Sequence, residues 1–145
     1  MDAERVREYL LQLPHVVETM QWGANLVFWV GDKAIGGKMF ALLNLADDHK
    51  AVLSLHVGLE RYAELLEIEG VFPAPYLARA HWVALRHWRA LRTGELEEQL
   101  RHGHALIYAR LPKRTRDVLA MPPGMQRKLL KGRRKQLAER AAAAR

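Results

Sequence analysis

Apolar residues near the start of the chain recur at helical spacing. Their intervals follow the period of about 3.6 residues that places side chains on one face of an α-helix. Asp2 can cap such a helix, and Pro14 ends it. The apolar face consists of Val6, Tyr9, Leu10 and Leu13. We therefore expect an amphipathic helix over residues 3–13.

The next part of the chain alternates short apolar runs with polar turns, a pattern typical of β-strands. Runs at residues 26–30, 38–45 and 51–57 are separated by short segments that contain Gly or Asp. Strands joined by such turns pair in antiparallel fashion. We expect a three-stranded meander, with the β-branched residues 16–20 as a candidate for a further strand before it.

Two prolines follow a helical pattern at residues 60–68. Pro73 and Pro75 fix φ and favour extended geometry in the residues before them, so this connector is not helical. Residues 81–85, which come next, have the composition of a short strand. The order of elements so far is helix, meander, helix and strand.

The rest of the chain is predicted to be helical, over residues 95–109 and 113–119. Residues 125–145 contain good helix formers but few apolar residues, so they form either a marginal surface helix or a segment that is disordered until bound. The whole order predicts an α+β domain with helices packed on one face of an antiparallel sheet.

The positive charge is concentrated in the last quarter of the chain. Residues 1–109 hold 11 Lys and Arg against 14 Asp and Glu, a net −3, within a formal total of +7. Residues 110–145 hold 12 against 2, a net +10. Such a segment is either a solvated tail or a surface that meets phosphates, because clustered cations repel one another unless solvent or a polyanion screens them.

Composition excludes several classes of function. The absence of cysteine excludes thiol catalysis, thiolate metal sites and disulfides, and it fits a cytoplasmic location. The single serine, Ser54, lies inside a predicted strand and not in a turn that would expose a nucleophile. No apolar run has membrane-spanning length. We expect a non-enzymatic protein without a cofactor, a metal or a membrane segment.

Five motifs, in order and at the expected spacing, resemble the MmcQ/YjbR family over roughly residues 1–119. They are Val27-Phe28-Trp29-Val30-Gly31, Gly37-Lys38-Met39-Phe40-Ala41-Leu42, Pro73-Ala74-Pro75-Tyr76-Leu77, His81-Trp82-Val83 and Leu111-Pro112-Lys113-Arg114. The resemblance implies a CyaY-like α+β fold and DNA binding. We expect one domain over residues 1–119 and a basic C-terminal extension, helical or disordered, over residues 120–145.

The chain departs from the family pattern in two places. The basic extension after Ala120 lies outside the match. Ala34-Ile35, before Gly36-Gly37, lengthen a hairpin turn relative to the shorter form that the resemblance leads us to expect.

The resemblance also implies candidate nucleic-acid-binding residues. Arg79, His81 and Trp82 carry over in the signature strand, and Lys113 and Arg114 carry over after the last core helix. The rings of His81 and Trp82 could bind a phosphate or stack on a base. The alternative is that Trp82 belongs to the core and His81 hydrogen-bonds to the connector backbone.

The basic extension supplies further candidates. On a helix its cations at three- and four-residue spacing share roughly one side and can follow a phosphate backbone. Few Asn or Gln are available to read base edges, so we expect sequence-independent contacts with DNA. The candidates in the last part of the chain are Lys113, Arg114, Arg116, Arg127, Lys128, Lys131, Arg134 and Lys135.

Two other hypotheses remain open. The first is a module that binds a small ligand or a partner protein in an aromatic pocket, with the basic tail for solubility or docking. The second is iron handling by frataxin-like analogy, which would need an acidic first helix, and here Arg5 and Arg7 interrupt the acids. The pocket hypothesis uses Trp22, Trp29, Tyr76 and Trp82.

Overall fold

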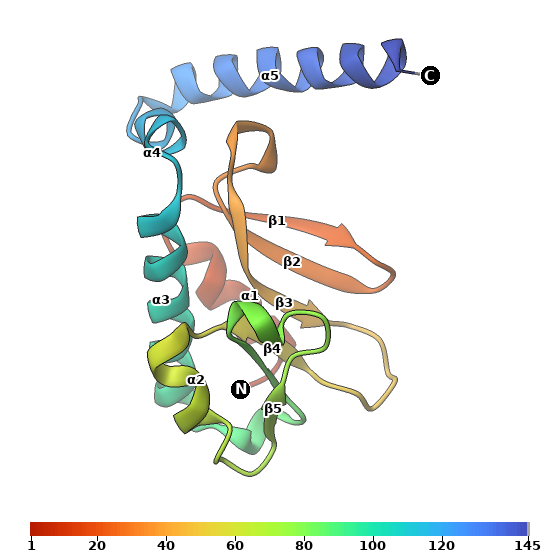
Figure 1. Ribbon diagram of the computed structural model, residues 1–145, viewed down its shortest axis with the longest axis vertical. Coiled ribbons are helices and arrows are strands. Elements are labelled where there is room, and N and C mark those ends of the chain that lie inside the picture. Colours follow the sequence, from red (N-terminus) through yellow and green to blue (C-terminus); the bar gives the residue numbers. More distant parts are fainter. Residues whose placement is uncertain (145) are drawn as a thin grey trace.

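The computed structural model describes residues 1–144 and consists of a six-stranded sheet with five α-helices (Figure 1). Neighbouring strands are antiparallel, in the order β1-β2-β3-β4-β6-β5. The α+β fold and the central meander predicted from the sequence are confirmed. The strands are β1 Val16–Gln21, β2 Asn25–Val30, β3 Lys38–Asn44, β4 Leu53–His56, β5 Val71–Pro73 and β6 Trp82–Leu85.

Every predicted helix is present, and the C-terminal extension, for which the sequence left two alternatives, is helical. The helices are α1 Ala3–Gln12, α2 Leu59–Leu65, α3 Thr93–Arg110, α4 Lys113–Leu119 and α5 Pro123–Ala143. Three short 3-10 turns complete the fold: η1 Lys33–Ile35 between β2 and β3, η2 Ala78–Ala80 between β5 and β6, and η3 Trp88–Ala90 before α3.

The main core lies between one face of the sheet and helices α1 and α3. Phe28 and Val30 alternate along β2 and both point into it, as the pleat of a strand requires. Leu10 of α1 and Leu100 of α3 meet them from the helical layer, and all four side chains are completely buried. The amphipathic pattern of the first helix therefore did indicate which side faces the sheet.

Helix α3 approaches β4 closely at Gly103. A Cβ at this position would lie 2.3 Å from the carbonyl oxygen of His56 in β4, closer than any side-chain atom can come. A glycine inside a helix costs about 1 kcal/mol relative to alanine. Leu100 and Ile107 are core residues of α3, and the close approach lets them pack tightly against the strands. This packing offsets the cost of the glycine.

The opposite face of the sheet is covered in part by the connection between β5 and β6. Ala74 and Leu77 of this connection pack with Phe72 against Trp82 and Ala84. Only 3% of the surface of Trp82 is exposed to solvent. This indole is therefore part of a second, smaller apolar cluster.

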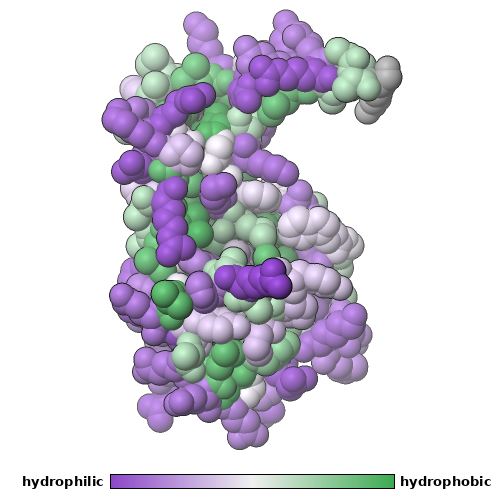
Figure 2. Space-filling view, in the orientation of Figure 1, coloured by the Kyte–Doolittle hydropathy of each residue, from purple (hydrophilic) through white to green (hydrophobic). Residues whose placement is uncertain are grey.

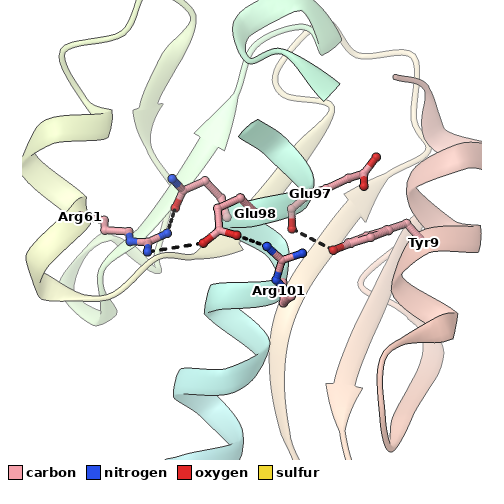
Figure 3. Close-up of polar contacts among 6 residues, drawn as sticks. Tyr9, Arg61, Glu97, Glu98 and Arg101 are labelled. Carbon is pink, nitrogen blue, oxygen red and sulfur yellow. Dashed lines mark hydrogen bonds and ion pairs between the residues drawn. The ribbon is translucent and has the colours of Figure 1, made fainter. Parts of the chain in front are cut away.

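Polar contacts link helices α1, α2 and α3 (Figure 3). Glu98 of α3 forms ion pairs with Arg61 of α2, at 3.6 Å between Nη2 and Oε1, and with Arg101 of its own helix. The Tyr9 hydroxyl of α1 donates to the Glu97 carbonyl oxygen at 3.1 Å. Partly exposed ion pairs contribute little free energy, about 0.5 kcal/mol each, so this network mainly orients the helices.

One buried histidine connects α3 to the end of α1. The Nε2–H group of His104 donates to the Pro14 carbonyl oxygen at 2.7 Å, and its ring lies edge-on to Phe40. Burial lowers the pKa of His104 below its ordinary value of 6.5, and the hydrogen bond to Pro14 opposes this effect. The folded state therefore holds this ring neutral.

Replacing Gly103 by alanine should destabilise the fold. The new Cβ meets backbone at the His56 carbonyl, so α3 must shift away from β4, and we expect the free energy of unfolding to fall by about 2 kcal/mol or more. Gly94→Ala is the matched control, because a Cβ there has no neighbour within 4 Å. Urea unfolding of both variants measures the difference. Equal stabilities would contradict the close approach.

Stability should also depend on His104 below neutral pH. The unfolded chain takes up a proton near pH 6.5, whereas the folded state resists it, so this stability is fully present above that pH and falls as the pH drops toward the lowered folded pKa. In His104→Gln, whose amide can still donate to Pro14, the loss of stability between about pH 7 and 5 should be smaller. Chemical denaturation at several pH values measures the slope, with exposed His49→Gln as the control. An unchanged slope in His104→Gln would contradict the assignment.

Candidate nucleic-acid interface

Helices α4 and α5 form the upper end of the molecule, where α5 crosses above the domain and projects beyond it (Figure 1). The turn between them is closed by Gln126. Its side-chain amide donates to the carbonyl oxygens of Leu119 and Met121, at 3.1 and 2.6 Å. The Leu119 carbonyl belongs to the unsatisfied end of α4 and the Met121 carbonyl to the turn that follows, so one side chain both completes that end and fixes the start of α5.

The β2–β3 hairpin holds both helices in place. The Thr115 hydroxyl of α4 donates to the Ile35 carbonyl oxygen at 2.7 Å, and Nε of Arg133 in α5 donates to the Ala34 carbonyl oxygen at 3.3 Å. Arg134 forms an ion pair with Asp32, whose other carboxylate oxygen accepts from the Ala34 amide at 2.8 Å. The lengthened turn at Ala34-Ile35 therefore provides the docking point for the C-terminal helices.

Two of the predicted phosphate-binding cations are already engaged with carboxylates. Arg134 pairs with Asp32, and Lys113 pairs with Asp117 at 3.0 Å. Arg116 is only partly exposed, and its Nε atom is buried. These side chains are less available to a ligand than the sequence suggested, because carboxylates engage Arg134 and Lys113 and burial encloses part of Arg116.

The other predicted cations of this region are exposed and make no ion pair within residues 1–144. Figure 2 shows hydrophilic side chains gathered along the upper side of α5. We call these residues the cationic surface; they are Arg114, Arg127, Lys128, Lys131 and Lys135.

The spacing of the cationic surface suits a polyanion. Arg127, Lys131 and Lys135 recur every four residues, so their Cα atoms follow one another at roughly 6 Å along the helix axis. One DNA strand carries a phosphate every ~3.4 Å along the duplex axis, so such a row can meet about every second phosphate. Like charges four residues apart destabilise an isolated helix, and an anionic partner removes that repulsion.

The segment that contains Arg79, His81 and Trp82 does not lie beside α5. Arg79 is exposed in η2, and the β5–β6 connection that contains it, green in Figure 1, lies in the middle of the view, away from α5 at the top. His81 closes η2 with a left-handed backbone, φ 62°, and packs edge-on against Tyr62. Arg79 in η2 and Lys113 in α4, both candidates from the family resemblance, therefore lie in different parts of the molecule.

The ligand-binding role considered for Trp82 is wrong for this conformation. Its ring is 3% exposed in the second apolar cluster, so it cannot stack on a base, and the alternative of a core role holds. The pattern of residues 81–85 predicted a strand but could not show which side of it would be covered. The covering segment is the β5–β6 connection itself.

The four aromatic residues of the pocket hypothesis do not converge. Trp29 and Trp82 are buried, at 8% and 3% exposure, whereas Trp22 and Tyr76 project from turns with exposures of 61% and 104%. Both turn residues have a left-handed backbone. Two surface cavities, one above α4 and one beside α2, are lined by none of the four.

A second buried histidine lies beside a cation at the end of α3. His56 Nε2 is 3.3 Å from Nη1 of Arg110, and His56 is 2% exposed. Burial first, and the charge of Arg110 second, lower the pKa of His56 below its ordinary value. The ring is thus held neutral where an Arg head group can approach it. This pairing had no signal in the sequence, because the two residues are far apart along the chain.

Two further features concern metals and membranes. Within residues 1–144, no three His, Asp or Glu side chains come together as a set that could hold a metal ion. In the same part of the chain, none of the helices has the length and apolar character needed to cross a bilayer.

Comparisons with known proteins agree with this architecture. The crystal structure of the Deinococcus radiodurans protein DR2400, described by its domain DUF419, is similar at a TM-score of 0.71 and 29% sequence identity, over 83% of this chain and 89% of that one. None of the curated proteins matches this chain. The family model described as YjbR matches residues 11–106. Since that match spans more than half of the chain, the protein belongs to the YjbR family.

Proposed function

We propose that this protein is a non-enzymatic DNA-binding protein that contacts mainly the phosphate backbone of the duplex. The observation that carries the proposal is the cationic surface of α4 and α5. Its exposed Lys and Arg side chains lack carboxylate partners within residues 1–144 and stand at regular spacing on a helix. An unneutralised row of this kind attracts a polyanion and gains free energy from the counterions that the polyanion releases.

The geometry favours backbone contacts over base readout. A side chain that reads a base edge needs a bidentate pair of donors or acceptors held in a groove, most often from Arg, Asn or Gln. On α5, the amide of Gln126 is already bound to the Leu119 and Met121 carbonyls, and Arg133 donates to Ala34. Three of the five side chains of the cationic surface are lysines, which act as point charges without directional preference.

The non-enzymatic part of the proposal rests on the chemistry of the candidate groups. Ser54 is 8% exposed in the middle of β4, so its hydroxyl does not face solvent as a nucleophile would. His104 is buried and donates to a backbone carbonyl, which leaves it in a structural role. Binding, and not bond breaking, is the activity that the exposed groups of the upper end support.

Neutralising the outward row of α5 should weaken DNA binding and flatten its salt dependence. For Arg127→Gln, Lys131→Gln, Lys135→Gln we expect a loss of affinity of at least about ten-fold near 100 mM salt. The slope of log affinity against log salt should fall in magnitude by roughly 2 to 3, because each lost phosphate contact removes about 0.9. Fluorescence anisotropy with labelled duplexes of two unrelated sequences measures both quantities.

The control removes the same number of charges from another exposed region. Arg86→Gln, Arg89→Gln, Arg92→Gln changes the basic group around η3 and leaves the cationic surface intact. Its affinity and salt slope should stay within about two-fold of the parent. If both triple variants lose the same affinity, binding follows net charge alone, and the proposal for α5 fails.

A further inference from the structure

The side of α5 that faces the domain forms a groove with α4 and the η1 turn. The groove has a volume of about 1500 Å³ and runs along α5 from Met125 to Arg140. Its apolar lining comes from all three elements: Ile35, Pro112, Val118, Met125, Leu129 and Leu137. In Figure 2 hydrophobic atoms are visible beneath the hydrophilic side chains of α5, where the helix overhangs a hollow.

The apolar side chains of α5 in this groove are incompletely covered. Met125, Leu129 and Leu137 stand on one stripe at intervals of four and eight residues, and they are 54%, 44% and 39% exposed. A surface helix normally buries such a stripe against another element. Here Gly132 lies between Leu129 and Leu137, and a Cβ there would meet no atom within 4 Å, so the groove has room at its centre.

The rim of the groove, formed by its charged lining residues, carries only cations within the described residues. Among its lining residues no Asp or Glu occurs. The cations that line it come from the hairpin, α4 and α5: Lys33, Lys113, Arg114, Lys128, Arg133 and Arg140. An occupant must therefore offer apolar side chains to the floor and negative charge to the rim.

Charge decides which kind of occupant fits. Residues 123–143 carry seven Lys and Arg and one Glu, a net +6, so the same helix from a second copy would be repelled. A DNA backbone complements the rim but has no apolar side chains for Leu129 and Leu137. We propose that the groove binds an acidic amphipathic helix of a partner protein, whose apolar face contacts the stripe and whose carboxylates meet the rim.

The dimensions agree with such a helix. From Met125 to Arg140 the groove follows 16 residues of α5, whose Cα atoms span roughly 22 Å at ~1.5 Å per residue, which accommodates about four turns of a partner helix. The groove and the cationic surface share Lys128 and Arg114 but differ in their other residues. The partner helix should therefore compete with DNA through the shared cations while depending on leucines that DNA does not touch.

A designed peptide tests the proposal on the full chain. The probe is a fluorescent peptide of about 15 residues, with leucines spaced three and four apart and glutamates at the other positions. We expect it to bind, and we expect Leu129→Gln, Leu137→Gln to lose at least about ten-fold of the peptide affinity while DNA affinity stays within about two-fold. Both leucines are partly exposed, and a thermal melt checks that this variant remains folded.

Two controls separate the groove from general attraction between opposite charges. A peptide of the same composition with scrambled leucine positions should bind at least about ten-fold more weakly. Lys131→Gln, Lys135→Gln, which changes only the outward side of α5, should keep the peptide affinity within about three-fold. Equal binding of both peptides, a loss in the outward variant as large as in the leucine variant, or no peptide binding at all would each overturn the proposal.

Discussion

The arrangement of the upper end of the molecule depends on how closely the β2–β3 hairpin approaches α4. A Cβ at Gly36 would lie 2.4 Å from the Thr115 hydroxyl oxygen, and a Cβ at Gly37 would lie 1.9 Å from the Gly31 carbonyl oxygen. Only residues without a side chain let the turn close and let Thr115 reach the Ile35 carbonyl. This contact positions α4, and through the short turn after it α5, so both the cationic surface and the groove depend on it.

Local sequence patterns predicted the helices and strands well, but they predicted less well which residues contact or cover each side chain. The period of apolar residues and the prolines placed α4 at residues 113–119, and its observed bounds agree, because helix ends are decided by nearby residues. The burial of Trp82 depends instead on the β5–β6 connection folding over it. The engagement of Arg134 depends on Asp32, about a hundred residues earlier. Neither contact can be predicted from the spacing of neighbouring residues in the sequence.

The lengthened turn at Ala34-Ile35 illustrates the same limit. In the sequence it is a departure from the family pattern, with no apparent role. In the structure its two carbonyl oxygens accept from Arg133 and Thr115, and Ile35 lines the groove. The turn and the basic extension, which the sequence shows as two unrelated departures, thus form one structural unit. Their relation could be seen only after the hairpin and the helices were brought together.

The way α5 is held has a consequence for its motion. Beyond the Gln126 turn, its polar contacts to the hairpin are the Arg134–Asp32 ion pair and the Arg133–Ala34 hydrogen bond, which together contribute on the order of 1–2 kcal/mol because they are partly exposed. A difference of ~1.4 kcal/mol is a factor of ten in population. Breaking both contacts would therefore raise the population in which α5 is released from the hairpin by roughly ten-fold. A ligand that contacts α5 in only one of these two arrangements would select between a docked and a released extension.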